Sequence, residues 1–247
     1  MAGHSKWANI KHRKGAADAK RGKLFTKLIK EVSVAAREGG GDPGSNPRLR
    51  LAVQNAKGAN MPKDNIERAI KKATGAGAVD YQEPTYEGYG PNGVAVFVET
   101  ATDNLNRTVA SVRAAFNKYG GSLGTNGSLE FIFERKGIFT FPTPEGFDED
   151  EFTLEAIDAG VEEVEVEEGY VSVSCSVSDF GNVNKKLEEL SITAEEANLQ
   201  RIPNTLVSLD DDAFSKVIKL INVLEDDDDV QKVYHNIEVT EAQAELM

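Results

Sequence analysis

The residues best suited to chemistry are the cations that crowd the first thirty positions of the chain. Nine Lys and Arg stand between residues 6 and 30, against one acidic residue, Asp18. Cations at this density neutralise nucleic-acid phosphates, and the release of counterions makes such binding salt-dependent. Trp7 adds a ring that either stacks on an unpaired base or packs inward as a hydrophobic plug. The predicted phosphate contacts are Lys6, Lys11, Arg13, Lys14, Lys20, Arg21, Lys23, Lys27 and Lys30.

Charge is divided unevenly along the chain. Up to Gly75 there are 17 Lys and Arg against 6 Asp and Glu, whereas the rest of the chain has 11 against 35, and the whole carries −13. A basic lobe joined to acidic ones indicates that one end meets a polyanion, which is a nucleic acid in the simplest case. The alternative is a charge pattern that serves solubility alone.

Catalytic signatures are missing from the sequence. There is no phosphate-binding loop with its Lys, no Gly-x-Ser-x-Gly elbow, no His-Glu-x-x-His and no pair of Cys-x-x-Cys motifs. The carboxylates come in runs such as 225–229, which are typical of solvated surface rather than of acid–base pairs. Cys175 lies in an alternating segment and is expected in the core. We therefore expect no enzyme activity, no cofactor and no metal site.

The first 78 residues are predicted to form a small helical domain. Apolar residues at spacings of three and four mark a helix from Asp18 to about Glu38, with its lysines on the opposite face. Asn46 and Pro47 suit the N-cap and first turn of a second helix. A third helix is expected from Pro62 or Asp64, with a capping box between Asp64 and Glu67.

After residue 80 the apolar period changes to two, as in strands. Two strands are predicted around Gly90–Gly93, then a helix capped by Asp103 or Asn104, then two further strands about Lys136-Gly137. Further along we expect a helix at 150–160, paired strands about residues 168–169, a helix capped by Ser178 or Asp179, and a short strand at 197–201. A helix over 210–224 and a last strand close the pattern.

This order of elements predicts an α+β multidomain protein. Its α/β parts favour the ferredoxin-like, split β-α-β type of sheet. The last helix and strand can complete the sheet that begins at Tyr81. We therefore predict a basic helical domain at 1–78, an α/β domain from 79–142 and 204–247, and an acidic α/β domain inserted at 143–203. Three domains in simple succession are the alternative.

Several long motifs resemble the YebC family. They include "AGHSKWANIKHRKGAADAKRGKLFTKLIKEV", "NMPKDNIERAI", "YEGYGPNGVA" and "TDNLNRTVASVR", all in the family's order. The resemblance implies a helical domain followed by two α/β domains, one inserted in the other. Carried onto this chain, the nucleic-acid contacts fall on Lys6, Trp7, Lys11, His12, Arg13, Lys14 and the 20–30 face. Possible secondary contacts are Arg48, Arg50, Asn104, Asn106 and Arg107, where Asn104 and its neighbours could equally serve as a helix cap.

Two functions follow from the resemblance and the charge pattern. Members of the family are described as DNA-binding regulators of transcription in the cytoplasm, and others look like ribosome-associated activators of translation on difficult sequences such as proline runs. A cationic face binds phosphate in DNA and in ribosomal RNA alike, so the sequence does not separate the two. We expect a nucleic acid as the partner, with the ribosome as the alternative setting, and neither a membrane nor a small-molecule substrate.

Overall fold

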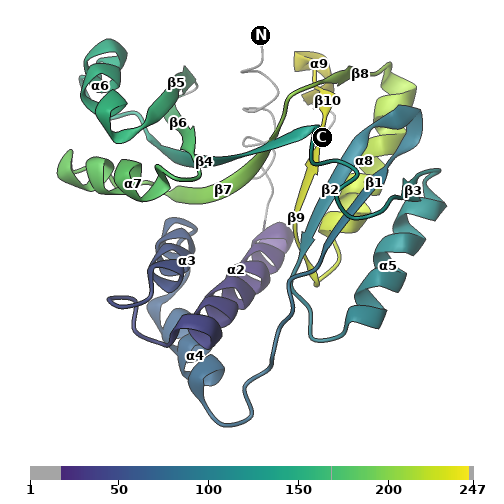
Figure 1. The fold of residues 1–247 in the computed structure, drawn as a ribbon, viewed down its shortest axis with the longest axis horizontal. Coiled ribbons are helices and arrows are strands. Elements are labelled where there is room, and N and C mark those ends of the chain that lie inside the picture. Colours follow the sequence, from purple (N-terminus) through teal and green to yellow (C-terminus); the bar gives the residue numbers. More distant parts are fainter. Residues whose placement is uncertain (1–17, 168, 245–247) are drawn as a thin grey trace.

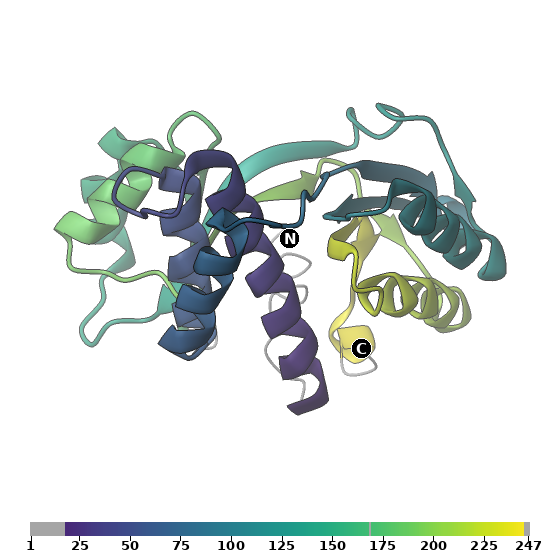
Figure 2. The same cartoon turned by 90° about the horizontal axis from the view of Figure 1, so that it is seen from below.

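The computed structural model describes residues 18–167 and 169–244, and of residues 18–21 and 241 it describes the backbone alone (Figures 1 and 2). Its elements confirm an α+β architecture with a helical part at the N-terminal end. In chain order they are α2 (Asp18–Gly39), α3 (Pro47–Gly58), α4 (Lys63–Thr74), β1 (Thr85–Tyr89), η1 (Pro91–Gly93), β2 (Ala95–Thr100), α5 (Leu105–Lys118), β3 (Ser122–Leu123), β4 (Phe133–Pro142), α6 (Glu149–Ala156), η2 (Ile157–Ala159), β5 (Val161–Glu167), β6 (Tyr170–Ser176), α7 (Phe180–Glu189), β7 (Glu196–Pro203), β8 (Val207–Ser208), α8 (Asp211–Glu225), β9 (Val230–His235), β10 (Ile237–Glu238) and α9 (Glu241–Ala244).

Helices α2, α3 and α4 form the helical unit. Their core is built largely from alanines, which allow the helix axes to approach closely, together with Val32, Leu49 and Ile66. Asn46 is the N-cap of α3, as predicted: its side-chain oxygen accepts from Leu49 N at 3.0 Å. Its amide also donates to Ala35 O of α2 at 2.7 Å, so one residue joins two helices.

The predicted capping box of the third helix is wrong. Helix α4 begins at Lys63 after Pro62, and its N-terminus has no side-chain cap. Pro62 itself lies one position before the helix with an extended ψ of 136°. Because Asp64 is therefore already inside the first turn, its carboxylate is not at the N-cap position that a capping box requires. Glu67 instead pairs with Lys63 at 3.4 Å.

The first sheet has the strand order β3-β1-β2-β9. Strands β2 and β3 are both antiparallel to β1 and are joined by α5, which is a split β-α-β unit. The faces of α5 and α8 that carry Phe116, Phe214 and Leu220 pack on Val96 and Val98. Strand β9 pairs with β2, so the last helix and strand complete the sheet that begins near Tyr81, as predicted.

The second sheet has the order β5-β6-β4-β7 and is antiparallel throughout. Strands β4 and β5 are joined by α6 and flank β6, and strands β6 and β7 are joined by α7 and flank β4. This confirms the ferredoxin-like prediction. Both helices pack on the face that carries Phe139, Phe141 and Val173, and Cys175 is buried there, as predicted.

Two strands predicted about Lys136-Gly137 are in fact one, β4. A Cβ at Gly137 would lie 2.6 Å from the Phe180 ring and 2.7 Å from Cys175 Sγ, so this glycine makes room for packing and not for a turn. Strand β4 also belongs to the second sheet, although residues 133–142 were assigned to the first α/β domain. Strands of the first sheet stand on both sides of 133–203 in the sequence; the division into domains stays a prediction.

The helical unit contacts the second sheet through α3. Asn55 lies against the free edge of β7, where its amide donates to Ala197 O at 2.9 Å and its oxygen accepts from Ala197 N at 2.9 Å. A Cβ at Gly58 would lie 1.9 Å from Glu195 O, so glycine permits this close approach. We call this contact the amide junction. Figure 2 shows the helical unit between the second-sheet unit and the helices of the first sheet.

Candidate nucleic-acid interface

Most of the predicted arm contacts lie outside the described residues. These are Lys6, Trp7, Lys11, His12, Arg13 and Lys14. Lys20 and Arg21 lie in the first turns of α2, where only the backbone is described. Their roles in binding stay predictions.

The lysines of α2 that the structure describes turn toward residues 225–229, which we call the acidic loop. Lys23 Nζ lies 2.5 Å from Asp226 Oδ1, and both side chains are exposed. Lys27 Nζ donates to Glu225 O at 2.9 Å. These lysines of α2 thus lie against the most acidic run of the chain, which had been expected to be solvated surface. We call this contact the ionic junction.

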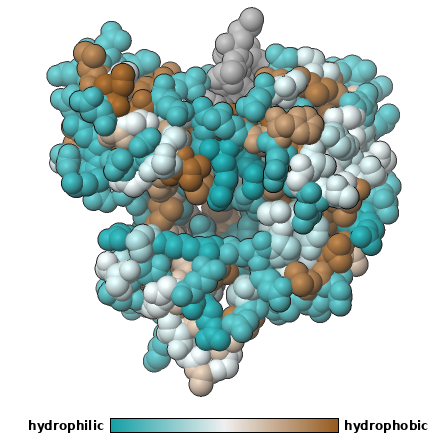
Figure 3. All heavy atoms as spheres, in the orientation of Figure 1, coloured by the Kyte–Doolittle hydropathy of each residue, from teal (hydrophilic) through white to brown (hydrophobic). Residues whose placement is uncertain are grey.

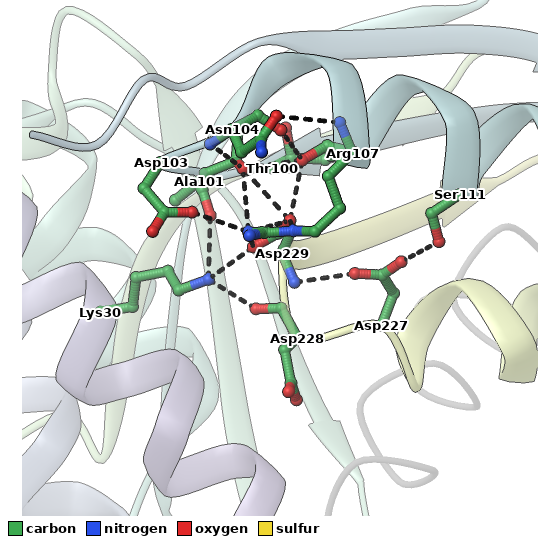
Figure 4. A network of polar contacts seen from close by, with 12 residues as sticks. Lys30, Thr100, Ala101, Asp103, Asn104, Arg107, Ser111, Asp227, Asp228 and Asp229 are labelled. Carbon is green, nitrogen blue, oxygen red and sulfur yellow. Dashed lines mark hydrogen bonds and ion pairs between the residues drawn. The ribbon is translucent and has the colours of Figure 1, made fainter.

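Lys30 is buried, so its prediction as part of a solvent-facing cationic stripe is wrong. Its ammonium donates to Asp228 O at 2.7 Å, to Ala101 O at 3.0 Å and to Asp229 Oδ1 at 3.2 Å (Figure 4). A helical wheel places Lys30 opposite the apolar stripe, but α2 lies between two units and buries residues on both sides. In this arrangement the ammonium of Lys30 is held by groups of the protein itself, and a phosphate contact from Lys30 stays a prediction.

Asp229 is the centre of the ionic junction. Its carboxylate accepts from Arg107 Nη2 at 2.7 Å and from the hydroxyls of Thr108 at 2.8 Å and Thr102 at 3.1 Å, in addition to Lys30. Burial alone would raise the pKa of Asp229. The hydrogen bonds from Arg107, Thr108 and Lys30 outweigh burial and hold that pKa below its ordinary value of 3.8. The carboxylate is therefore charged at neutral pH.

The segment 103–107 was predicted either to cap a helix or to bind phosphate. Asn104 is the N-cap of α5, and its side-chain oxygen accepts from Arg107 N at 3.1 Å. Arg107 contacts Asp103 and Asp229, so its guanidinium is already paired with two carboxylates. Asn106 is exposed. The capping prediction is confirmed, and phosphate binding by these residues stays a prediction.

The other two secondary candidates differ in their surroundings. Arg48 lies 2.5 Å from Glu38 and 2.5 Å from Glu83, and both contacts are exposed ion pairs. Arg50 is exposed, and its guanidinium has no hydrogen bond or ion pair among the described residues. Arg50 is thus the better placed of the two to meet an external anion.

Sequence reasoning passed over a group of cations on α4. Arg68, Lys71 and Lys72 are exposed, and within the described part of the chain they have no ion pair. Helix α4 has its apolar residues on one narrow face, which leaves the opposite face to these side chains. The periodicity of α4 places these cations on its outer face, but an exposed cation on an amphipathic helix is also typical of ordinary surface, so the sequence does not single them out.

A central cleft lies where the three units meet. Its volume is about 1990 Å³, and it is lined by cations and carboxylates from all three, among them Lys23, Arg50, Arg201, Glu99 and Glu196. In Figure 3 the surface is hollowed where the second-sheet unit meets the helical unit below it. Because its charge is mixed, the cleft as a whole does not form a single cationic groove.

The described residues offer little to covalent or metal chemistry. Within them no group of three or more His, Cys, Asp or Glu is placed to hold a metal ion. Burial raises the pKa of the Cys175 thiol to about 11, so it stays protonated at neutral pH. No helix in the described ranges is long and apolar enough to cross a membrane.

A basic helical unit joined to two α/β sheets is the arrangement of a known family of proteins, which comparison with family models identifies. Residues 5–76 match the model of the TACO1/YebC protein N-terminal domain, and residues 81–237 match that of the TACO1/YebC second and third domain. The chain therefore belongs to the TACO1/YebC family.

Individual relatives support this membership. A protein of Amoebophilus asiaticus is 57% identical over 96% of this chain and 98% of its own length, and one of Pseudomonas fluorescens is 56% identical over the full length of both. Each is named "Probable transcriptional regulatory protein". The crystal structure of a conserved hypothetical protein from Aquifex aeolicus superposes with a TM-score of 0.82 at 45% identity, covering 92% of this chain and 94% of that one.

Proposed function

We propose that this protein is a nucleic-acid-binding regulator of gene expression that acts on DNA in transcription. The observation that carries the proposal is the separation of charge, +11 up to Gly75 and −24 beyond it, in a chain whose relatives are named as transcriptional regulators. The protein acts by binding, without a cofactor or catalysis, and works in the cytoplasm.

The cations that suit this role belong to the N-terminal arm and to the exposed surface of the helical unit. On that surface the side chains of Arg50, Arg68, Lys71 and Lys72 are exposed and unpaired among the described residues. Contacts of this kind position a protein on phosphates without reading base sequence. Lys27 and Lys30 are excluded from the set because their ammonium groups are held by the acidic loop.

Binding of a DNA duplex at several salt concentrations tests the proposal. Replacing Lys11, Arg13 and Lys14 by Glu should weaken binding and lower the slope of log K against log salt by about 1 for each phosphate that is no longer neutralised. Replacing Lys216 and Lys219 of α8 by Glu is the matched control, since both are exposed but lie in the acidic part of the chain. Equal affinity of the arm variant and the wild type would contradict the proposal.

One observation favours ribosomal RNA as the second candidate. In the part of α2 whose side chains the structure describes, Lys23, Lys27 and Lys30 contact the acidic loop and Arg37 pairs with Asp80. This part of α2 therefore does not present the free cationic face that a helix in a major groove requires. Double-stranded RNA is recognised mostly by its shape and by contacts with 2′-hydroxyl and phosphate groups, and not by a helix in its major groove. Sedimentation of a cell lysate at two salt concentrations, with crosslinking of bound nucleic acid, separates the candidates: migration with ribosomal subunits and no enrichment on chromosomal DNA would exclude the transcriptional role.

A further inference from the structure

The second sheet has one apolar face and one polar face. Helices α6 and α7 pack on the apolar face, which holds Phe139, Val173 and Ala197. Register places the alternate residues of each strand on the other face: Glu163 lies opposite Ser174, Glu165 opposite Ser172, and Thr140 lies between Ser172 and Glu196. We call this surface the docking face: Thr140, Glu163, Glu165, Ser172, Ser174, Glu196 and Asn198, with the buried Ile138 between Ser174 and Asn198.

The docking face is more buried than a solvated sheet surface would be. Thr140 is 1% exposed, Ser174 is 3% exposed and Asn198 is 5% exposed. Ser174 Oγ and Asn198 Oδ1 have no hydrogen-bond partner among the described residues, although the Asn198 amide donates to Glu196 at 2.7 Å. Buried polar atoms are normally paired, so unpaired ones on a covered polar face point to a ligand that supplies donors and acceptors.

The position of α2 indicates which ligand this is. Lys23, Leu24 and Lys27 of α2 line the same central cleft as Ser172, Glu196 and Asn198. Three of the seven docking-face residues thus share this cleft with the start of α2, and the 17 residues that precede α2 can span up to roughly 56–61 Å when extended, which is enough to reach the rest of the face. That segment carries Lys6, Lys11, Arg13 and Lys14 and no acidic residue.

We propose that the docking face binds the chain's own basic N-terminal segment, residues 1–17. The carboxylates of Glu163, Glu165 and Glu196 pair with its Lys and Arg side chains, and the small hydroxyl and amide groups between them hydrogen-bond its backbone. Charge-assisted hydrogen bonds of this kind are the stronger ones available to a short segment. The docking does not require nucleic acid, but it occupies the cations that the proposed function assigns to phosphate, so docking and nucleic-acid binding compete.

Trp7 reports on the docking directly because it is the only Trp of the chain. In the full-length protein at low salt, its emission should be blue-shifted and shielded from iodide. Replacing Glu163, Glu165 and Glu196 together by Gln should shift the emission to the red and open Trp7 to iodide. Raising the salt from about 0.05 M to about 0.5 M should do the same to the wild type, because exposed ion pairs are screened.

The matched control removes the same number of carboxylates from α6, which lies on the opposite face of the second sheet. Glu149, Glu151 and Glu155 of α6 are exposed, and α6 packs on the apolar face. Replacing these three by Gln should leave Trp7 unchanged. Reversal of Lys11, Arg13 and Lys14 to Glu should release the segment. Combining that reversal with Glu163→Lys, Glu165→Lys and Glu196→Lys should restore shielding of Trp7.

Each other outcome overturns the inference. Trp7 that is open to iodide at low salt means that the segment does not dock. If Trp7 stays shielded after the three Gln changes, the N-terminal segment docks elsewhere. The same conclusion follows if the α6 control also abolishes the shielding. Shielding that depends on protein concentration means that a second copy is the occupant. The proposed function fails separately, if reversal of Lys11, Arg13 and Lys14 leaves DNA affinity unchanged while Trp7 shows docking.

Discussion

The helical unit is fixed to its two neighbours by contacts of opposite character. The amide junction joins α3 to β7 through one neutral side chain, Asn55, and through the close approach that Gly58 permits. The ionic junction joins α2 to the acidic loop through lysines, with the buried pair of Lys30 and Asp229 at its centre. One junction consists of neutral hydrogen bonds and close packing, which we expect to be insensitive to salt and pH, whereas the other consists of charged groups, which we expect to respond to both.

The pairing of Lys30 with Asp229 explains why a basic helix and an acidic loop coexist in one chain. A buried ion pair gains little over a well-packed apolar pair, but loss of one partner leaves the other charge uncompensated. The junction therefore holds α2 in a defined place, and loss of either Lys30 or Asp229 at its centre should strongly destabilise the fold. At its exposed end, Lys23 and Asp226 are bound much less firmly.

The largest effect is expected from removing the centre of the ionic junction. Asp229→Ala leaves the ammonium of Lys30 buried without its carboxylate and removes the main partner of Arg107. We expect a loss of about 3–5 kcal/mol in the free energy of unfolding, measured by chemical denaturation. Asp228→Ala is the matched control: Lys30 bonds only the backbone carbonyl of Asp228, so that variant should lose less than about 0.5 kcal/mol. Equal losses in the two variants would show that the carboxylate of Asp229 is not the anchor.

A smaller loss is expected at the amide junction. Asn55→Ala leaves Ala197 N–H and C=O at the edge of β7 without partners, which costs about 1–3 kcal/mol in the free energy of unfolding. Gln54→Ala serves as the control because its single bond, to Ala194 O, is longer at 3.2 Å. The Asn55 loss should be the same at low and high salt. A strong salt dependence would contradict the distinction between the junctions.

Of the two junctions, only the ionic one should contribute to the pH dependence of stability; outside the junctions, hydrogen bonds from Gly44 and Ser45 also lower the pKa of Asp42. Because the pKa of Asp229 is lowered in the folded protein, its contribution to stability is complete above the unfolded value of about 3.9 and is lost as the pH falls through the folded pKa. Unfolding measured from about pH 6 downward should therefore show a loss that begins near pH 4 and is reduced in Asp229→Asn. Asn55→Ala should keep the pH profile of the wild type. A profile unchanged by Asp229→Asn would place the acid-sensitive group elsewhere.

Local signals predicted most of the elements, while contacts distant in sequence escaped prediction. The caps at Asn46 and Asn104 were readable because a cap and its helix are adjacent in the chain. Lys30 was misplaced because its partner is 199 positions away, and a helical wheel assumes one buried face. Gly137 was read as a turn because glycine marks turns and tight packing alike, and only the tertiary neighbours Phe180 and Cys175 distinguish them.

The sequence predicted that the helical unit carries a cationic surface, but it did not predict which Lys and Arg side chains form that surface. Segregation of charge marked the helical part as cationic, yet it did not separate cations that meet carboxylates of the same chain from those left outside. Arg48 and Arg50 are two positions apart in sequence, and only Arg48 forms ion pairs with acidic neighbours among the described residues. The exposed cations of α4 carry no local mark that distinguishes them from ordinary surface residues. Knowledge of which carboxylates stand nearby is tertiary information.

The smallest effect on stability is expected at the exposed end of the ionic junction. A variant there tests whether the charged junction, unlike the amide junction, can exchange its partner for a phosphate. Lys23→Gln breaks an ion pair whose side chains are 46% and 68% exposed, so the free energy of unfolding should fall by less than about 0.5 kcal/mol. If Lys23 can exchange Asp226 for a phosphate, the same change should also lower the salt slope of nucleic-acid binding by about 1. Asp226→Asn should act in the opposite direction on affinity, because it removes the internal competitor and leaves Lys23 in place. A variant pair that alters neither slope nor affinity would confine α2 to a structural role, and the cations that bind nucleic acid would then lie on the N-terminal arm and on α4.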